Sequence, residues 1–301
     1  MQRPCRAMLT PMRIVIATSA AYRDLAAGDR LYRDALGRRG ATVAAGVWTD
    51  GLAPFRGADL VVIRSTWDYH RDLARYRAWL DALETAGIAV ANPVALVRWN
   101  LEKSYLDALA AQGIAVPAQR LVPCELDAAR GALAETGWAQ AVAKPAVGAS
   151  GHGVSLVEPA TLEAQWPMLA AAVAPHRLVL QEFVPEIRAE GQLCYVFLGG
   201  RFAHAVRHLP RAGEFRINSV FAPTRTVVEP PAADIAAAAR VLAALPLAPL
   251  YARIDMVRQS GRQLLLEAEV HEPGLQFDLV PASAERFAEA TLAWAEGAAP
   301  R

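Results

Sequence analysis

A lysine followed by a glycine-rich loop is the first feature of the sequence that could do chemistry. Lys144 ends an apolar run in "VAKPAVGASGHGVSLV", and Gly148, Gly151 and Gly153 follow before the next apolar run. Glycines let main-chain N–H groups converge on an anion, and a lysine adds a mobile positive charge, so together they could hold phosphates. No Lys-Ser or Lys-Thr follows the glycines, which excludes the P-loop pattern. A β-hairpin with a surface lysine is the alternative, and these residues alone leave both open.

Three acidic residues fall on two neighbouring apolar strands near the end of the chain. Glu267 and Glu269 are two residues apart in "LLLEAEV", so both point to one face of the predicted strand. Asp255 interrupts the apolar run "ARIDMV" in the same way, and a hairpin would bring the three carboxylates together. Like charges on an interior strand repel and lose hydration, and Mg2+ would remove both penalties. Pairing with Arg253 or Arg258 is the alternative, but three acids on adjacent strands favour the metal.

An arginine and an asparagine two residues apart form a third candidate. Arg216 and Asn218 lie in "GEFRIN", after a turn-like "RAGE", and share a face. A guanidinium there could reach a transferred phosphoryl group, because its fork of donors matches the phosphoryl oxygens. A solvated loop arginine is the alternative. The position of the motif between a predicted hairpin and the Asp255 strand favours a function.

A polar and aromatic motif, "IRSTWDYHRD", follows the apolar strand "DLVVI". Ligands bind at such strand ends in open α/β sheets, so Arg64 is predicted to clamp a substrate carboxylate. Trp67, Asp68 and Tyr69 could shape the pocket around an amine, or they could pack between domains and cap the next helix. The capping role is at least as well supported for Asp68. His271 could contact substrate, but a buried, hydrogen-bonded histidine is favoured.

The elements that must position these residues begin with alternating strands and helices. Apolar, β-branched runs predict strands at 13–18, 41–47 and 59–63, and amphipathic spacing predicts helices at 29–40 and 72–87. This alternation predicts a parallel α/β sheet with right-handed crossovers.

From about residue 91 the pattern changes. The segment "ANPVALVRWN", at 91–100, is predicted to be a linker because of its Asn-Pro pair. A helix at 101–113 is predicted to carry Lys103. The remaining elements are predicted as a strand at 178–187, hairpins around Gly199-Gly200 and Ser260-Gly261, and helices at 232–245 and 283–297.

The bulk composition excludes several classes of protein. The 301 residues suffice for two or three compact units, and 54% hydrophobic against 20% charged residues excludes disorder. A formal charge of +1 gives no sign of a nucleic-acid surface. No stretch has the length of a signal peptide or a membrane span, residues 1–11 read as a loose extension, and a cytoplasmic protein is expected. The cysteines, which lack metal-ligand spacing, are predicted to be free thiols: Cys5, Cys124 and Cys194.

The order of these motifs resembles the ATP-grasp superfamily of ligases. Lys103 and Lys144, which are the only two lysines, are followed by "QEFV", "GEFRIN", Asp255 and the Glu267-x-Glu269 pair. "GEFRIN" is also similar to the motif of bacterial glutathione synthetases and ribosomal-protein glutamate ligases. The resemblance runs from about residue 100 to 279. Further motifs, "RSTWDYHRD", "RWNLEKSYLDAL", "KPAVGASG" and "FAHAVRHLP", resemble a bacterial subgroup that includes the cyclo-ligase closing O-ureidoserine to cycloserine.

The resemblance implies a fold and a set of sites. It implies an ATP-grasp fold, α/β at first and α+β later, with an N-terminal parallel α/β domain at 12–93, a central domain at 94–181 and a C-terminal domain at 182–301. The last two would grip ATP, and Arg216 and Asn218 would be catalytic. The residues implied to bind ATP are Lys103, Lys144, Gly148, Ser150, Gly151, Glu182, Phe183, Val184, Glu190 and Gln192.

Some positions depart from the family pattern. Glu269 stands where many members carry asparagine, and Gln192 where an acidic residue is common. His271 and Gly274 replace residues that are usually aliphatic and bulkier. These departures concern the substrate rather than the chemistry of ATP.

The implied function is an ADP-forming ligase that uses ATP and Mg2+. ATP would phosphorylate the carboxylate of a small amino-acid-like substrate, and an amine would attack the acyl phosphate. Two other functions stay open: an intramolecular cyclo-ligase, and a nucleotide-binding module that no longer catalyses. The module is disfavoured because the phosphate lysines and the acids are intact. No nucleic-acid or membrane partner is expected. Because members of the resembled family are often dimers or tetramers, a homodimer or a homotetramer stays open.

Overall fold

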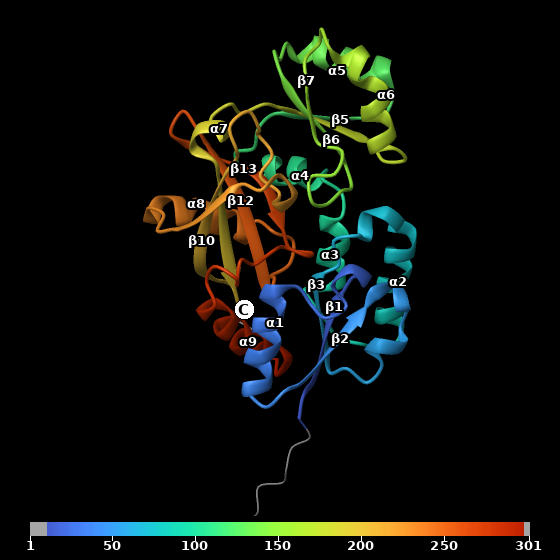
Figure 1. Cartoon of the computed structure of the whole chain (residues 1–301), viewed down its shortest axis with the longest axis vertical. Helices are drawn as coiled ribbons and strands as arrows, with labels where there is room; N and C mark the ends of the chain where they lie inside the picture. Colours follow the sequence, from blue (N-terminus) through green and yellow to red (C-terminus); the bar gives the residue numbers. More distant parts are fainter. Residues whose placement is uncertain (1–10, 298–301) are drawn as a thin grey trace, which may run out of the picture.

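The computed structural model describes residues 11–297. Their strands form three sheets, with helices between the strands (Figure 1). The first has the strand order β2-β1-β3-β4, and every pair in it is parallel, as the alternation predicts. Its elements are β1 (Arg13–Thr18), α1 (Ala27–Arg38), β2 (Thr42–Val47), β3 (Leu60–Ser65), α2 (Leu73–Thr85) and β4 (Val90–Ala91).

The segment predicted to be a linker is in fact a helix. Pro93 occupies the N-cap position of α3 (Val94–Asn100), where its missing N–H costs no hydrogen bond. The side chains of Val94, Leu96 and Val97 are buried. A turn then leads to α4 (Tyr105–Ala111). Lys103 lies in that turn rather than within a helix, because α4 starts later than its apolar spacing suggested.

The second sheet is antiparallel, with the order β5-β8-β6-β7, and lies at the top of Figure 1 beside two helices. The glycine-rich loop connects β6 to β7, so it is the turn of a hairpin, and Lys144 is the fourth residue of β6. The elements are β5 (Gln119–Val122), α5 (Leu126–Thr136), β6 (Ala141–Pro145), β7 (Ser155–Val157), α6 (Leu162–Val173) and β8 (Leu178–Glu182).

The third sheet is antiparallel, with the order β11-β10-β9-β12-β13. Both hairpins fall where their Gly-Gly and Ser-Gly turns predict, and Ser260 and Gly261 have the positive φ that such turns need. The elements are α7 (Ile187–Glu190), β9 (Gln192–Leu198), β10 (Arg201–Leu209), β11 (Thr224–Val228), α8 (Ala232–Ala243), β12 (Tyr251–Gln259), β13 (Arg262–Glu269) and α9 (Ala282–Ala295). Short 3-10 turns lie at Ala20–Tyr22, Trp48–Asp50, Ala53–Phe55, Tyr69–Asp72 and Ser219–Phe221.

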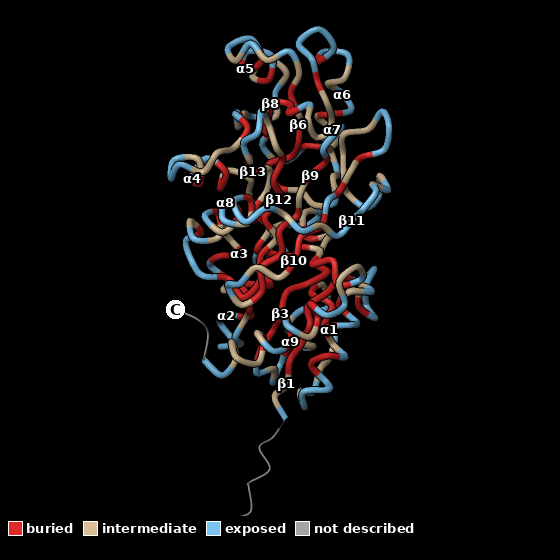
Figure 2. The backbone as a smooth tube through the Cα atoms, turned by 90° about the vertical axis from the view of Figure 1, so that its left-hand side faces the viewer, coloured by how far each residue is buried: buried red, intermediate tan, exposed pale blue. Residues whose placement is uncertain are grey.

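The first and third sheets share a continuous apolar core. In Figure 2 the buried parts of both sheets are drawn in red. One apolar cluster contains Ile14 of β1 and Tyr32 of α1 together with Tyr251 of β12 and Phe287 of α9. The buried Asn92 side chain adds polar links, because it donates to the Tyr251 carbonyl at 2.8 Å and accepts from the Leu250 amide at 2.6 Å. These contacts therefore fix the position of the first sheet relative to the third. No helix in the described range is long and apolar enough to cross a membrane.

Candidate active site

A cavity of about 760 Å³ lies where the three sheets meet. Each sheet contributes to its lining: the first unit through Arg64 and Trp67, the second through Lys144 and the glycine-rich loop, and the third through the acidic strands. The sequence motifs that are far apart in the chain therefore face one space. Its volume suits a nucleotide together with a small second molecule.

The three predicted acids meet in this cavity. Asp255 lies opposite Glu267 in the β12–β13 register, and Arg253 lies opposite Glu269. Carboxylate oxygens of Asp255, Glu267 and Glu269 lie within 4.8 Å of one another. The hard oxygen donors, their number and their burial fit a Mg2+ ion.

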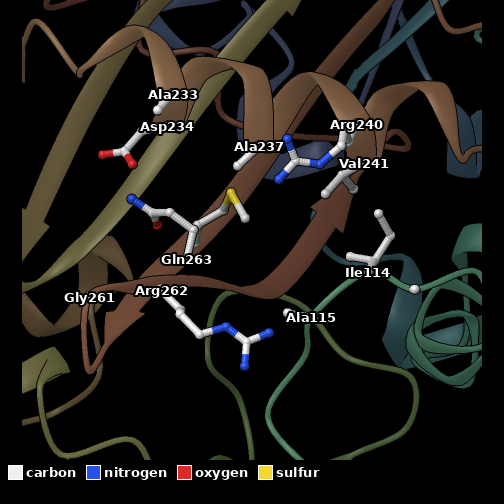
Figure 3. Close-up of a pocket in the computed structure, with 12 residues that line it drawn as sticks. Ile114, Ala115, Ala233, Asp234, Ala237, Arg240, Val241, Gly261, Arg262 and Gln263 are labelled. Atoms are coloured by element: carbon white, nitrogen blue, oxygen red, sulfur yellow. The ribbon is translucent and has the colours of Figure 1, made fainter.

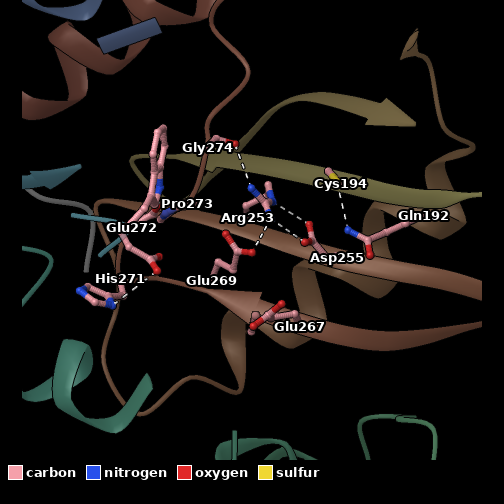
Figure 4. Close-up of polar contacts among 12 residues, drawn as sticks. Gln192, Cys194, Arg253, Asp255, Glu267, Glu269, His271, Glu272, Pro273 and Gly274 are labelled. Atoms are coloured by element: carbon pink, nitrogen blue, oxygen red, sulfur yellow. Dashed lines mark hydrogen bonds and ion pairs between the residues drawn. The ribbon is translucent and has the colours of Figure 1, made fainter. Parts of the chain in front are cut away.

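Arg253 pairs with two members of this cluster (Figure 4). Its guanidinium donates to both carboxylate oxygens of Asp255 at 2.8 Å and also to Glu269. Of the two arginines that the sequence offers as alternative partners, Arg253 makes these pairs, whereas Arg258 pairs with Asp234. Arg253 lines the cavity beside the acids, so it can act on bound phosphates as well as on the carboxylates.

The electrostatics of the acids follow from their burial and their partners. Burial alone would raise the pKa of Glu267, but Lys103 and Lys144 bring it below its ordinary value. Burial raises the pKa of Glu269 well above the usual range, despite Arg253. Burial and then the charge of Glu267 raise the pKa of Glu272 to about 7. Burial thus disfavours the charged forms of Glu269 and Glu272, and a cation bound at the cluster would stabilise them.

The two lysines point at the same region as the acids. Lys103 donates to Glu267 at 2.8 Å and to the Gly148 carbonyl at 3.4 Å. Lys144 is 9% exposed and donates to Gln181 at 3.1 Å. Burial lowers the pKa of Lys144 to about 8. Two ammonium groups beside three carboxylates are the expected arrangement for a triphosphate and its cation, and the individual roles stay predictions.

The glycine-rich loop approaches the "GEFRIN" segment across the cavity. A Cβ atom at Gly151 would lie 2.4 Å from Oδ1 of Asn218, and Gly151 has a φ of +73°. Only glycine fits there, because both the space and the backbone angle exclude a side chain. Tyr69 also reaches this loop, donating to the Gly148 carbonyl at 3.4 Å. The loop thus forms one wall of the cavity.

Arg216 is bound to a neighbour of its own motif. Its Nε and Nη2 atoms donate to the two oxygens of Glu214 at 3.0 and 2.7 Å. The hydrogen bonds from Arg216 lower the pKa of Glu214 to about 2. The guanidinium also lies over the Phe221 ring at 3.9 Å and lines the cavity. It is positioned at the site, and its contact with a phosphoryl group stays a prediction.

The residues of the N-terminal motif divide into two groups. Arg64 is 2% exposed, pairs with Asp29 at 3.0 Å and lines the cavity, and its Nη1 atom has no partner in the described structure. Trp67 lines the cavity and donates to the Glu272 carbonyl at 2.8 Å. Asp68 does not line it, because its carboxylate accepts from Trp48 at 2.7 Å.

Two further expectations concern Asp68 and His271. The alternative favoured for Asp68, a side-chain cap, is wrong, since Asp72 caps α2 by accepting from the Arg75 amide. His271 is buried and hydrogen-bonded to Tyr76, and burial lowers its pKa to about 3. That environment fits the alternative of a structural histidine, although the residue also lines the cavity.

The segment predicted to hold adenine follows β8. The Glu182 amide is engaged with the Ala118 carbonyl, so it cannot also donate to a base. The side chains of Glu182, Phe183, Val184 and Glu190 do not line the cavity, whereas Gln192 does. The Phe183 amide is engaged as well, with the Gln140 carbonyl, so any contact of this segment with adenine must use other main-chain groups.

Several residues of the site were not singled out from the sequence. The sequence presents Arg253 only as an alternative to a metal ion for neutralising the acids. Its position two residues before Asp255 places it on the same face of the strand as that acid. Glu272 lines the cavity, and only its place beside Pro273 could have drawn attention to it. Asp29 and Glu214 became visible only through their arginine partners.

A smaller cavity of about 310 Å³ lies apart from this site, between α8 and the β12–β13 hairpin (Figure 3). Met256 lines it, while the preceding Asp255 lines the large cavity, because neighbouring strand residues point to opposite faces. Arg240 and Arg262 line its sides. Asp234 also lines it, but neither Lys103 nor Lys144 does.

Comparisons of the sequence with known proteins give consistent relatives. The model of the N-terminal domain of the D-cycloserine synthetase DcsG matches residues 14–92. The cycloserine biosynthesis protein DcsG of Streptomyces lavendulae is 30% identical over 264 residues, which cover 81% of this chain and 85% of that protein.

Comparisons of the structure agree. The crystal structure of D-cycloserine synthetase DcsG matches with a TM-score of 0.85 and 27% identity, over 94% of this chain and 99% of that one. D-alanine–D-alanine ligase from Bacillus anthracis has a TM-score of 0.72 at 16% identity, covering 96% and 98% of the two chains. A RimK-domain ATP-grasp protein from Sphaerobacter thermophilus has a TM-score of 0.70 at 19% identity, covering 92% and 98%.

Proposed function

This chain belongs to the DcsG family of ATP-grasp enzymes and is an ATP-dependent ligase, and on that premise we propose the chemistry that its cavity performs. The proposed reaction joins the carboxylate of a small amino-acid-like molecule to an amine, with an acyl phosphate between the two steps and ADP and phosphate as products.

The observation that carries the proposal is the meeting of two lysines and three carboxylates in one cavity. Lys103 and Lys144 point to the same region as Asp255, Glu267 and Glu269, although the chain brings them from separate elements. A surface role would not explain burial of so many charges, because each loses hydration unless a ligand compensates it.

We propose that Asp255, Glu267 and Glu269 hold Mg2+ when nucleotide is bound. The ion would neutralise phosphate charge and orient the phosphates. Its arrival would compete with Arg253 for Asp255 and Glu269, which would free the guanidinium to face the phosphates.

The chain's own residues then have separate tasks. Lys144 and Lys103 hold the phosphates of ATP, and Arg64 holds a carboxylate of the substrate. One oxygen of the reacting carboxylate bonds to the γ-phosphorus while the bond from that phosphorus to ADP breaks. Arg216 stabilises the charge on the transferring group, for which it must exchange Glu214 for the phosphoryl oxygens. The glycine-rich loop excludes water from the acyl phosphate.

In the second step an amine bonds to the carbonyl carbon, the bond from that carbon to the phosphate oxygen breaks, and the amine loses a proton. Trp67 and Tyr69 lie on the cavity wall where they could shape the space for this amine. No covalent enzyme intermediate is required.

An intramolecular version of this reaction is the second candidate. It is favoured by the 30% identity to the cycloserine biosynthesis protein DcsG over most of both chains. In this version the amine and the acyl phosphate belong to one molecule, and a ring forms instead of a dipeptide-like bond.

A phosphate-release screen tests the proposal. The protein is incubated with ATP, Mg2+ and pools of D- and L-amino acids, dipeptides and O-ureidoserine, with the Glu267→Gln variant as a matched background. We expect phosphate release with one pool and none from the variant. Mass spectrometry then separates the candidates, because an intermolecular product contains both substrates and a ring contains one. Release that is equal in the variant, or independent of every pool, would contradict a ligase acting on these molecules.

A further inference from the structure

The smaller cavity, between α8 and the β12–β13 hairpin, has no part in the proposed reaction. Its volume of about 310 Å³ is at the lower end of the range for sites that bind small molecules. Three segments surround it: α8, the hairpin, and residues 113–115, which lie between α4 and β5. The Leu265 amide donates to the Ala115 carbonyl at 2.8 Å. Two of the three walls are therefore tied together by the main chain.

Apolar side chains form the inner wall of this cavity. Val241 of α8 and Met256 of β12 line it and are 1% and 2% exposed. Both belong to the apolar cluster under α8, and Ile114 packs against the same cluster. The hydrocarbon part of a ligand would lose contact with water on this wall, which favours binding.

The charges at the mouth of the cavity are not balanced. Arg240 extends from α8 and Arg262 from the hairpin, on opposite sides of the cavity in Figure 3. In the part of the chain that the structure describes, neither guanidinium makes an ion pair. Asp234 is the acidic residue of the lining, and it already pairs with Arg258. The lining therefore keeps two positive charges that an anion would neutralise.

The large cavity offers a comparison within the same chain. Each arginine that lines it has a carboxylate partner: Arg64, Arg216, Arg225 and Arg253. Water solvates a single exposed arginine well, so one unpaired guanidinium would indicate nothing. The combination of two guanidiniums without carboxylate partners and one apolar wall is what indicates a ligand.

We propose that the smaller cavity binds a small carboxylic acid with an aliphatic body. The guanidiniums of Arg240 and Arg262 would hold the carboxylate, because their donors match its two oxygens. The hydrocarbon part would lie on Val241, Met256 and Ile114. This site requires neither nucleotide nor Mg2+, so the proposal is independent of the proposed function.

Methionine methyl NMR tests the proposal on the whole chain, without nucleotide. Met256 lies in the cavity, whereas Met168 is 71% exposed on α6, so their methyl signals serve as the reporter and the internal control. The Met256→Leu variant assigns the reporter signal. 4-Methylpentanoate is the probe, and 4-methylpentanamide has the same shape without the charge. We expect the acid to shift the Met256 signal to saturation and the amide to bind about tenfold more weakly, because it cannot form the two ion pairs.

A double variant, Arg240→Gln/Arg262→Gln, removes the charges and keeps the apolar wall. Both side chains are exposed, so we expect an unchanged melting temperature. This variant should bind 4-methylpentanoate about tenfold more weakly than the wild type does. The matched control is Arg56→Gln/Arg77→Gln, which removes two exposed arginines elsewhere and should leave this affinity unchanged.

Several results would overturn the proposal. The Met256 signal could stay unmoved by the acid, or the acid and the amide could bind equally well. The two double variants could also weaken binding equally, which would reduce the effect to the net charge of the protein. Finally, inorganic phosphate could shift the Met256 signal as strongly as the acid does, which would leave no role for the apolar wall.

Discussion

The protonation of Lys144 gives the most quantitative prediction of the structure. Lys144 is 9% exposed, and in the described structure its ammonium group donates one hydrogen bond, to Gln181. Burial lowers its pKa to about 8. The charge of Glu267 raises this pKa, and the charge of Lys103 lowers it further. Nucleotide phosphates would favour the charged form, so binding takes up a proton once the pH exceeds the pKa of the free protein. Affinity must therefore fall as the pH rises through about 8.

The size of the effect follows from the fraction of Lys144 that is charged. With a pKa of about 8, roughly three quarters of the free protein carries the charge at about pH 7.5 and roughly 3% at about pH 9.5. The affinity for ADP should then fall about 25-fold over this interval, if the complex stays protonated. Losing a charge-assisted phosphate contact is worth about 1.5–3 kcal/mol, so Lys144→Met should weaken binding about 10- to 150-fold.

Calorimetric titration of ADP with Mg2+ at a series of pH values measures both effects. Lys144→Arg is the matched control, because an arginine stays charged over the whole interval. Its affinity for ADP should be lower than that of the wild type but should hardly vary with pH. A wild-type affinity that is constant between these pH values, or a slope that persists in the arginine variant, would refute the assignment of Lys144 to the phosphates.

Three other predictions concern turnover, once a substrate is known. Arg216→Ala should lower kcat about 10³-fold, because the contact forms with the transferring group, while ADP affinity changes little; Arg216→Lys should not restore the rate, and undiminished turnover would return Arg216 to a surface role. Glu267→Gln should abolish phosphate release more than it weakens ADP binding, and near-normal release at modest Mg2+ would show that the acids are not catalytic. Gly151→Ala should lower kcat, since a Cβ would lie 2.4 Å from Oδ1 of Asn218; an unchanged rate would show that the loop need not approach Asn218.

The sequence predicts the elements with regular periods well. The β12–β13 hairpin is an example, because a Ser-Gly turn between apolar strands sets the register, and the register puts Asp255 opposite Glu267. The glycine-rich hairpin after Lys144 follows from the same local rules. The helix at 94–100 is not predicted from the sequence, because its Asn-Pro start is typical of a linker. Burial of Val94 and Val97 against the first sheet, and of Leu96 in the core of the third sheet, stabilises this helix more than local propensity does.

The partners of the charged side chains could not be predicted, since they come from segments distant in the sequence. The Nε atom of Arg64 pairs with Asp29, and its Nη2 atom donates to the Pro273 carbonyl at 2.9 Å. The Asp68 carboxylate accepts a hydrogen bond from the Trp48 indole, 20 residues earlier in the sequence, at 2.7 Å. The choice between Arg253 and Arg258 for the acids depends on which arginine faces the cavity. Local patterns fix which residues share a face, whereas tertiary packing decides which groups meet.

The transfer of oxygen from the carboxylate to phosphate is the measurement that tests the central claim most directly. The acid found by the screen is labelled with 18O in its carboxylate and turned over with ATP, Mg2+ and the amine. An acyl phosphate requires that one labelled oxygen leave with the phosphoryl group, so the released phosphate should contain one 18O atom and the nucleotide product should be ADP. Unlabelled phosphate, or AMP with a labelled nucleotide, would contradict the reaction proposed for this cavity.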